Sequence, residues 1–147
     1  MMTYKLRKAL ESDSDRIRKL VIEADINPTG LDWRRFTLAV DEEDNLLGCG
    51  QLKPHGKDVL ELASIAVKPG YQKQGIARAI IEHLVTGSPR PIYLMCQSSL
   101  GPLYEKFNFH KLDYDQMPRY FQRVSKLVGI IEMFAQSDET LLIMKLE

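Results

Sequence analysis

The sequence has few cysteines, no long apolar segment and no excess charge of either sign. Its two cysteines, Cys49 and Cys96, lie in apolar, strand-like runs, which favours buried free thiols over a disulfide or a metal site. No apolar run approaches the roughly 18 residues of a membrane span. Lysine plus arginine and aspartate plus glutamate each number 20. A net charge of zero argues against bulk attraction to nucleic acid or an anionic membrane.

The N-terminus lacks the features of a secretory signal. Met1–Arg7 contains no apolar segment of the kind that a signal peptide requires, so a reducing cytoplasm is the expected compartment. The 147 residues are 44% hydrophobic, which is enough for one domain with its own core. No repeat, low-complexity segment or linker divides them, so we expect a single domain over residues 1–147.

Hydrophobic periodicity predicts alternating strands and helices. The run Ser12-Asp13-Ser14-Asp15 fits a capping box, with Ser12 as the cap and Asp15 reaching back. The strand expected at 91–96 follows a strand–helix pair, so it should run parallel to the strand at 59–67. The expected fold is α+β or α/β, a mixed, mostly antiparallel sheet with helices on both faces. Strands are expected at 3–8, 36–41, 46–53, 59–67, 91–96, 109–112 and 140–146, and helices after 12, near 75–85, at 100–107 and after 118.

The most informative segment joins an apolar strand to a helix. The β-branched run that ends at Val67 is followed by Pro69, Gly70, a polar loop and Gly75, after which a helical apolar pattern begins at once. A helix N-terminus with approachable backbone N–H groups favours anions. This segment is therefore expected to hold a phosphorylated ligand.

Two well-known phosphate motifs do not fit. Gly70 to Gly75 has the glycine spacing of a Walker loop, but Ile76 and Ala77 replace the required Lys and Ser or Thr. Gly48-Cys49-Gly50 begins like a dinucleotide fingerprint, but Lys53 stands at the third glycine and the run lies in a strand. Nucleotide hydrolysis and a nicotinamide cofactor are therefore poorly supported.

What remains is Gln72-x-x-Gly75-x-Ala77 after the strand. It resembles the acetyl-CoA pyrophosphate loop of the GNAT superfamily of N-acetyltransferases, which reads Gln/Arg-x-x-Gly-x-Gly/Ala. Downstream, 103–109 reads Leu-Tyr-Glu-Lys-Phe-Asn-Phe and resembles the Leu-Tyr-Glu-Lys-Leu-Gly-Phe segment of that family. Asn108 replaces the glycine, and because Asn tolerates a left-handed backbone the helix end should survive. The resemblance spans most of the chain and is specific from about residue 46 to 112.

The resemblance implies a fold in which the parallel strands at 59–67 and 91–96 splay apart around acetyl-CoA. Backbone groups of Ile65, Ala66 and Val67 would pair with the pantetheine, and the N–H of Ala66 or Val67 would polarise the thioester carbonyl. Gln97 stands where the family often has asparagine and would also contact the pantetheine. The pyrophosphate would be bound by Gln72, Lys73, Gln74, Gly75, Ile76, Ala77 and Arg78.

The implied reaction is direct attack of a neutral amine on the acetyl carbon. Tyr104 is the candidate general acid, because a phenol with a pKa near 10 stays protonated while the thiolate leaves. Glu61 is the candidate base, acting directly or through water, and His55 is the alternative because imidazole titrates near neutrality. His83 and His110 show no ligand spacing, so no metal is expected.

The acceptor is less well determined. Arginines near an aromatic residue would suit a carboxylate-bearing amine such as an amino acid, although a solvated basic face accounts for them equally well. We expect a small-molecule amine rather than a protein, nucleic acid or membrane, and no sequence feature decides between a monomer and a homodimer. A CoA-binding sensor without catalysis and an interaction domain that uses the scaffold alone are the alternatives. Residues that could line the acceptor pocket are Trp33, Arg34, Arg35, Arg119, Tyr120 and Arg123.

Overall fold

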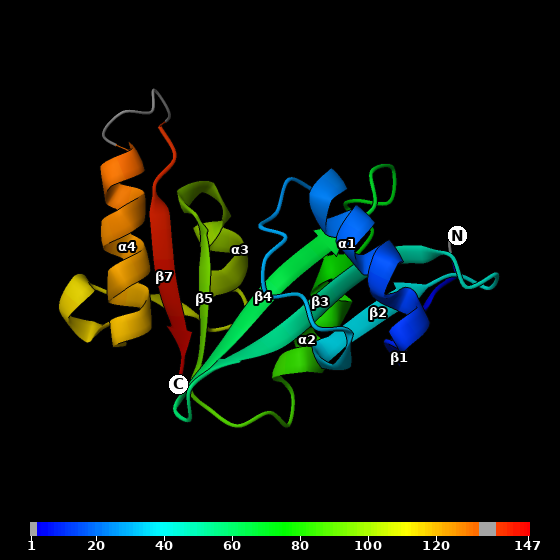
Figure 1. Cartoon of the computed structure of the whole chain (residues 1–147), viewed down its shortest axis with the longest axis horizontal. Helices are drawn as coiled ribbons and strands as arrows, with labels where there is room; N and C mark the ends of the chain where they lie inside the picture. Colours follow the sequence, from blue (N-terminus) through cyan, green and yellow to red (C-terminus); the bar gives the residue numbers. More distant parts are fainter. Residues whose placement is uncertain (1–2, 133–137) are drawn as a thin grey trace. The chain divides into compact units, whose positions relative to one another are not determined.

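Seven strands form one mixed sheet in the computed structural model of the chain, which describes residues 3–132 and 138–147 (Figure 1). The sheet order is β1-β2-β3-β4-β5-β7-β6. The pairs β1–β2, β2–β3, β5–β7 and β6–β7 are antiparallel. β4 and β5 are parallel, with Glu61 opposite Tyr93. The strands are β1 (Lys5–Lys8), β2 (Phe36–Val40), β3 (Leu46–His55), β4 (Val59–Val67), β5 (Ile92–Gln97), β6 (His110–Lys111) and β7 (Leu141–Leu146).

Within the described residues, four α-helices and four short 3-10 turns connect the strands. The predicted fold class is confirmed, and the parallel β4–β5 pair has the predicted direction. Predicted strand boundaries differ from the observed ones by at most two residues, and β4 matches its prediction at both ends. The helices are α1 (Ser14–Glu23), α2 (Ile76–Val85), α3 (Gly101–Glu105) and α4 (Arg119–Glu132), and the turns are η1 (Glu11–Asp13), η2 (Trp33–Arg35), η3 (Ser98–Leu100) and η4 (Tyr114–Gln116).

The chain divides into two units. The N-terminal unit comprises Met1–Lys53 and Leu62–Ser88, and the C-terminal unit comprises Pro54–Glu61 and Pro89–Glu147. The boundary between the two units therefore crosses β4 between Glu61 and Leu62. The single domain expected over residues 1–147 stays a prediction.

In the N-terminal unit, α1 and α2 cover opposite faces of the sheet (Figure 1). Ile17 and Leu20 of α1 belong to the same buried cluster as Leu38 of β2 and Cys49 of β3. Successive residues of a strand face opposite sides, so the glycines beside Cys49 face α2. A Cβ on Gly48 would lie 2.8 Å from the Ile76 side chain. The glycines of the Gly-Cys-Gly run thus let α2 approach β3.

The entry into α1 differs from its predicted capping. The Asp13 carboxylate accepts a hydrogen bond from the backbone N–H of Leu10 at 2.7 Å, so Asp13 rather than Asp15 is the residue that reaches back. Ser12 provides no side-chain cap, because the first helical turn here is η1, which begins one residue before Ser12. Asp13 is buried, and its charge is balanced by Arg7, whose Nη1 lies 2.9 Å from Asp13 Oδ2.

The core of the C-terminal unit lies between α4 and the strands β5 and β7. Its buried cluster consists of Tyr93, Leu112, Phe121 and Ile143. Asn108 has a φ of +72°, so the expected left-handed helix end is confirmed. Both cysteines are free and buried, as expected. Within residues 3–132 and 138–147, no helix combines the length and the apolar character needed to cross a membrane.

Candidate active site

A polar loop in the N-terminal unit connects β4 to α2. It begins with a turn in which the backbone N–H of Tyr71 donates to the carbonyl of Lys68 at 3.0 Å. Three of its residues have a left-handed backbone: Gly70 at φ +92°, Lys73 at +63° and Gly75 at +83°. A Cβ on Gly75 would meet no atom within 4 Å. Glycine is therefore favoured at position 75 by its backbone conformation and by open access to the loop, not by a tight fit.

The loop leads directly into the N-terminus of α2, with Gly75 as the N-cap residue. Ile76 is buried and anchors the helix start in the core, whereas Gln72, Lys73 and Gln74 are exposed. The first N–H groups of a helix have no acceptor within it. Arg78 adds positive charge, although its Nε also lies 3.7 Å from Glu82. The segment thus presents backbone donors and cations to solvent, an arrangement that can bind a pyrophosphate.

The end of β4 has an irregular backbone just before the predicted pantetheine-binding residues. Ser64 has a φ of +59°, which is typical of a bulge, and its Oγ accepts a hydrogen bond from Gln51 Nε2 at 2.9 Å. The N–H of Lys68 donates to Leu47 of β3 at 2.8 Å. Because consecutive N–H groups of a strand point to opposite sides, that of Val67 points away from β3.

The backbone N–H of Ala66 points toward β3, because it lies on the same side of the strand as that of Lys68. The Cys49 thiol of β3 donates to the carbonyl of Ser64 at 3.5 Å, and burial raises the pKa of this thiol to about 12. Of the two N–H groups predicted to polarise the thioester carbonyl, that of Val67 is therefore better suited. Ile65 and Val67 are half-buried and Ala66 is buried.

Tyr104 lies in the C-terminal unit, on the short helix α3. Its side chain is 9% exposed, and its ring packs edge-on against Phe109 with the centroids 6.1 Å apart. Burial, with a smaller effect of Cys96, raises the pKa of the Tyr104 phenol to about 12. The phenol therefore keeps its proton throughout the neutral range. Gln97 is exposed at the end of β5.

The two predicted base candidates of the C-terminal unit are in direct contact. His55 Nε2 lies 2.6 Å from Glu61 Oε1, and Glu61 is only 4% exposed. Tyr120 stacks on the His55 ring with centroids 3.7 Å apart and planes 19° apart. Burial and the charge of Glu61 raise the pKa of Tyr120. The sequence had suggested Glu61 and His55 as alternatives and Tyr120 as an acceptor contact, whereas the structure joins all three.

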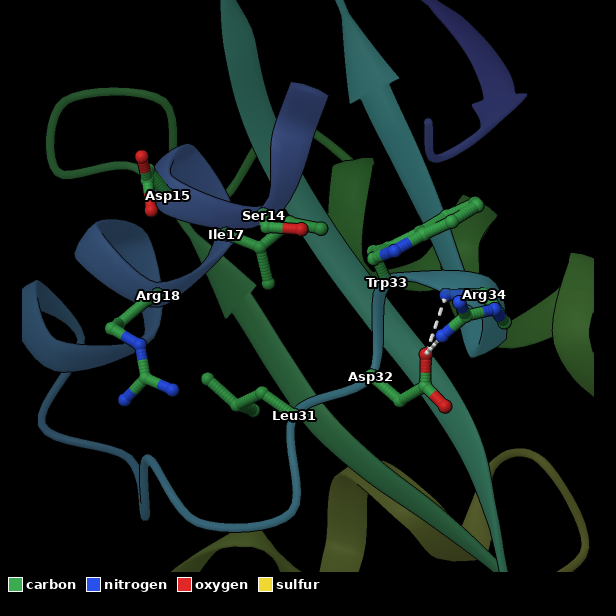
Figure 2. A pocket seen from close by; sticks show the side chains of 8 residues that line it. All are labelled: Ser14, Asp15, Ile17, Arg18, Leu31, Asp32, Trp33 and Arg34. Carbon is green, nitrogen blue, oxygen red and sulfur yellow. Dashed lines mark hydrogen bonds and ion pairs between the residues drawn. The ribbon is translucent and has the colours of Figure 1, made fainter. Parts of the chain in front are cut away.

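A pocket of about 430 Å³ opens in the N-terminal unit between α1 and the segment before β2. Figure 2 shows Arg18 on one side of this pocket and Asp32 with Arg34 on the other, with Ile17 and Leu31 between them. Arg34 Nη1 lies 3.3 Å from Asp32, and its guanidinium lies over the Trp33 ring at 4.8 Å. The pocket is lined by Ser14, Asp15, Ile17, Arg18, Leu31, Asp32, Trp33 and Arg34.

The predicted acceptor residues therefore divide between the units. Trp33 and Arg34 line the pocket of the N-terminal unit. Arg35 is half-buried, with its Nη2 3.9 Å from Asp32. Arg119 and Arg123 are exposed on α4 in the C-terminal unit. Among residues 3–132 and 138–147, no three His, Cys, Asp or Glu side chains form a group that could hold a metal ion.

Comparison with known proteins gives one family and many similar folds. The family model described as "Acetyltransferase (GNAT) domain" matches residues 32–111. The solved structure of N-acetylglutamate synthase from Neisseria gonorrhoeae, complexed with coenzyme A and N-acetyl-glutamate, has a TM-score of 0.75 and 17% identity. That similarity covers all of this chain but 36% of the synthase chain, so this chain spans about a third of the synthase. A search of curated proteins finds no match.

Two further structures match over nearly their whole lengths. Rv2747 from Mycobacterium tuberculosis, in complex with CoA and NLQ, has a TM-score of 0.69 at 18% identity, covering 95% of this chain and 97% of that one. An acetyltransferase of the GNAT family from Staphylococcus aureus Mu50 has a TM-score of 0.69 at 14% identity, covering 99% and 100%. At these identities the likeness concerns the fold.

Proposed function

This chain belongs to the GNAT acetyltransferase family, and we propose that it transfers the acetyl group of acetyl-CoA to the primary amine of a small molecule. The observation that carries the proposal is the loop between β4 and α2, which combines left-handed glycines, exposed cations and the N-terminus of a helix. The family match includes this loop and Tyr104. Acyl transfer follows from the family, and the amine acceptor is our proposal.

We assign the donor phosphates to the loop and the pantetheine to the end of β4. Gln72, Lys73, Gln74 and the first residues of α2 would bind the pyrophosphate through backbone N–H groups and charge-assisted contacts. Ile65 and Val67 would supply backbone groups to the pantetheine amides, and Gln97 would offer its side-chain amide. The structures of two similar proteins contain coenzyme A, which supports CoA as the donor.

The chemistry requires stabilisation of the carbonyl oxygen, a base and an acid. We assign the first role to the N–H of Val67, because it points away from β3 while that of Ala66 points toward β3. The base is Glu61 together with the histidine bonded to it. Tyr104, which stays protonated, donates to the thiolate sulfur as the carbon–sulfur bond breaks.

The acceptor is proposed to be small and to carry a carboxylate. A pocket of about 430 Å³ falls in the size range of small-molecule sites. Its lining includes two arginines and two aspartates, which can pair with a carboxylate and an ammonium group of one small molecule. The similar synthase was solved with N-acetyl-glutamate, an acetylated amine that carries carboxylates. Both observations favour amino acids and related amines over a protein acceptor.

The proposal is tested in two steps. Isothermal titration with acetyl-CoA measures donor binding, and release of the CoA thiol in the presence of amino acids, polyamines and amino sugars measures transfer. We expect binding and thiol release with a carboxylate-bearing amine. Binding without release for any amine would instead support a CoA-binding sensor, and absence of binding would contradict both.

A further inference from the structure

The hydrogen bond between His55 and Glu61 determines which imidazole nitrogen is available. A carboxylate only accepts hydrogen bonds, so at 2.6 Å the Nε2 atom of His55 carries the proton that it shares with Glu61 Oε1. In the neutral ring, the second nitrogen, Nδ1, then holds a lone pair. His55 can therefore accept a proton at Nδ1 while it remains attached to Glu61.

The burial of Glu61 makes it better suited to support another group than to act alone. It is 4% exposed, and His55 is the hydrogen-bond partner that the structure gives its carboxylate. A buried carboxylate is costly unless it is paired. When His55 gains a proton the pair becomes an ion pair, so Glu61 stabilises the imidazolium. The His55 side chain, at 13% exposure, is more accessible than that of Glu61 at 5%.

Aromatic rings hold the imidazole in place. Tyr120 stacks on its face at 3.7 Å, and Phe121 meets it edge-on with centroids 6.2 Å apart. On the strands beside them, Tyr93 lies opposite Glu61, and Lys145 Nζ lies 5.9 Å from the Tyr93 ring. Two titratable groups thus face the pair from neighbouring elements: Tyr120 of α4 stacks on His55, and Tyr93 of β5 is in register with Glu61.

We propose that His55 is the proton acceptor of the transfer reaction and that Glu61 and Tyr120 are its positioning residues. This inference rests on the proposed function. The amine nitrogen forms its bond to the acetyl carbon as the carbon–sulfur bond breaks, its proton passes to His55 Nδ1, and the thiolate sulfur takes the Tyr104 proton. His55 then releases its proton to solvent, and Tyr104 takes up a proton from solvent. The products are the N-acetylated amine and the CoA thiol.

The test measures kcat/KM against pH for wild type and variants. His55→Gln is expected to lower kcat/KM by about 100-fold and to abolish the acid-side inflection of the profile. Glu61→Gln is expected to lower kcat with little change in KM, because the imidazolium formed in the transfer step loses its counter-charge. The double variant His55→Gln/Glu61→Gln should have the same kcat/KM as His55→Gln alone, since the two residues act as a unit.

Tyr120 is tested by a pair of variants. Tyr120→Leu removes the stacked ring and should lower kcat with little change in KM, and Tyr120→Phe, which keeps the ring, should restore most of the rate. His83→Gln, on the exposed surface of α2, is the control and should leave rate and profile unchanged. Unaltered acetyl-CoA affinity and far-UV circular dichroism show that each variant is folded.

Two results overturn different claims. Suppose that wild type transfers acetyl groups while His55→Gln keeps the wild-type kcat/KM and pH profile, or that the reductions in kcat/KM of His55→Gln and Glu61→Gln are additive in free energy. Either result would show that the paired base is wrong, and the proposed function would stand. If wild type binds acetyl-CoA but acetylates no amine, the proposed function fails, and the role of His55 fails with it.

Discussion

Gly48 of β3 and Ile76 of α2 approach so closely that a Cβ on the glycine would lie 2.8 Å from Ile76 Cγ2. Gly48→Ala should therefore push α2 away from the sheet and lower the free energy of unfolding by about 1–3 kcal/mol. Chemical denaturation measures the change. Gly129→Ala is the control, because a Cβ there meets nothing within 4 Å and alanine is a better helix former. Equal stability of the Gly48 variant and wild type would contradict this packing.

The left-handed backbone of Gly75 should be required for donor binding. Gly75→Ala puts a side chain at a φ of +83° and is expected to shift the N–H groups at the start of α2, weakening acetyl-CoA binding about tenfold. This corresponds to about 1.4 kcal/mol, similar to the cost of a left-handed alanine. Isothermal titration gives the affinity.

The other end of α2 offers a matched control for this substitution. Gly87 has a φ of +77° and likewise has no neighbour within 4 Å of a built Cβ. Gly87→Ala should lose similar stability but keep wild-type affinity for acetyl-CoA. Equal loss of affinity in both variants would mean that general strain, not the loop, is responsible.

Removal of the Tyr104 hydroxyl should affect turnover and not donor binding. Tyr104→Phe is expected to lower kcat about 100-fold, within the range of general acid catalysis, with acetyl-CoA affinity unchanged. The pKa of the phenol is raised to about 12, so its ionisation should not reduce wild-type kcat at any pH up to about 10. Thiol release at saturating substrate checks both points, and unchanged turnover would exclude the acid role.

Acid should weaken the N-terminal unit through Asp13. The hydrogen bond from Arg7 holds the pKa of this buried carboxyl far below its usual range, against the opposing effect of burial. Its stabilisation is therefore fully present above about pH 4, the ordinary range for Asp, and is lost as the pH falls further. Asp13→Asn should lower the free energy of unfolding by about 3 kcal/mol at pH 7. Denaturation measured from pH 7 to 2 should show that the difference in free energy of unfolding between wild type and Asp13→Asn becomes smaller below pH 4.

The thiols of Cys49 and Cys96 should react only slowly with the thiol reagent of a CoA-release assay. Burial raises the pKa of Cys49 to about 12 and that of Cys96 to about 11. The reactive thiolate is therefore scarce at pH 8. Ellman's reagent should label the native protein far more slowly than the urea-unfolded protein. Rapid labelling of native protein would contradict the burial of both side chains.

Local features of the chain were predictable from the sequence alone. The apolar run of β4, the glycines after it and the helical pattern from Ile76 lie within one short stretch, and so do the residues of α3 around Tyr104. Secondary structure and a helix N-terminus depend mainly on neighbours in the sequence. Strand positions to within two residues and the left-handed Asn108 were therefore predicted correctly. The parallel direction of β5 followed from the strand–helix–strand order, and the family model agrees with the motifs.

Contacts between distant residues were not predictable, because they depend on strand register and on which face of a helix packs inward. The hairpin turn makes the strands of His55 and Glu61 neighbours, but a shift by one residue would turn either side chain to the other face. Asp13, which accepts a hydrogen bond from Leu10 at the start of η1, is likewise paired with Arg7, six residues earlier on another element.

By itself, the sequence determined the strand–loop–helix segment with the GNAT pattern, because the signals for these elements are local. Only the tertiary structure decided that α2 packs closely against Gly48, that the Cys49 thiol contacts the carbonyl of Ser64, and that His55, Glu61 and Tyr120 form one cluster. Each of these depends on atoms brought together by packing, for which no single stretch of sequence carries the information.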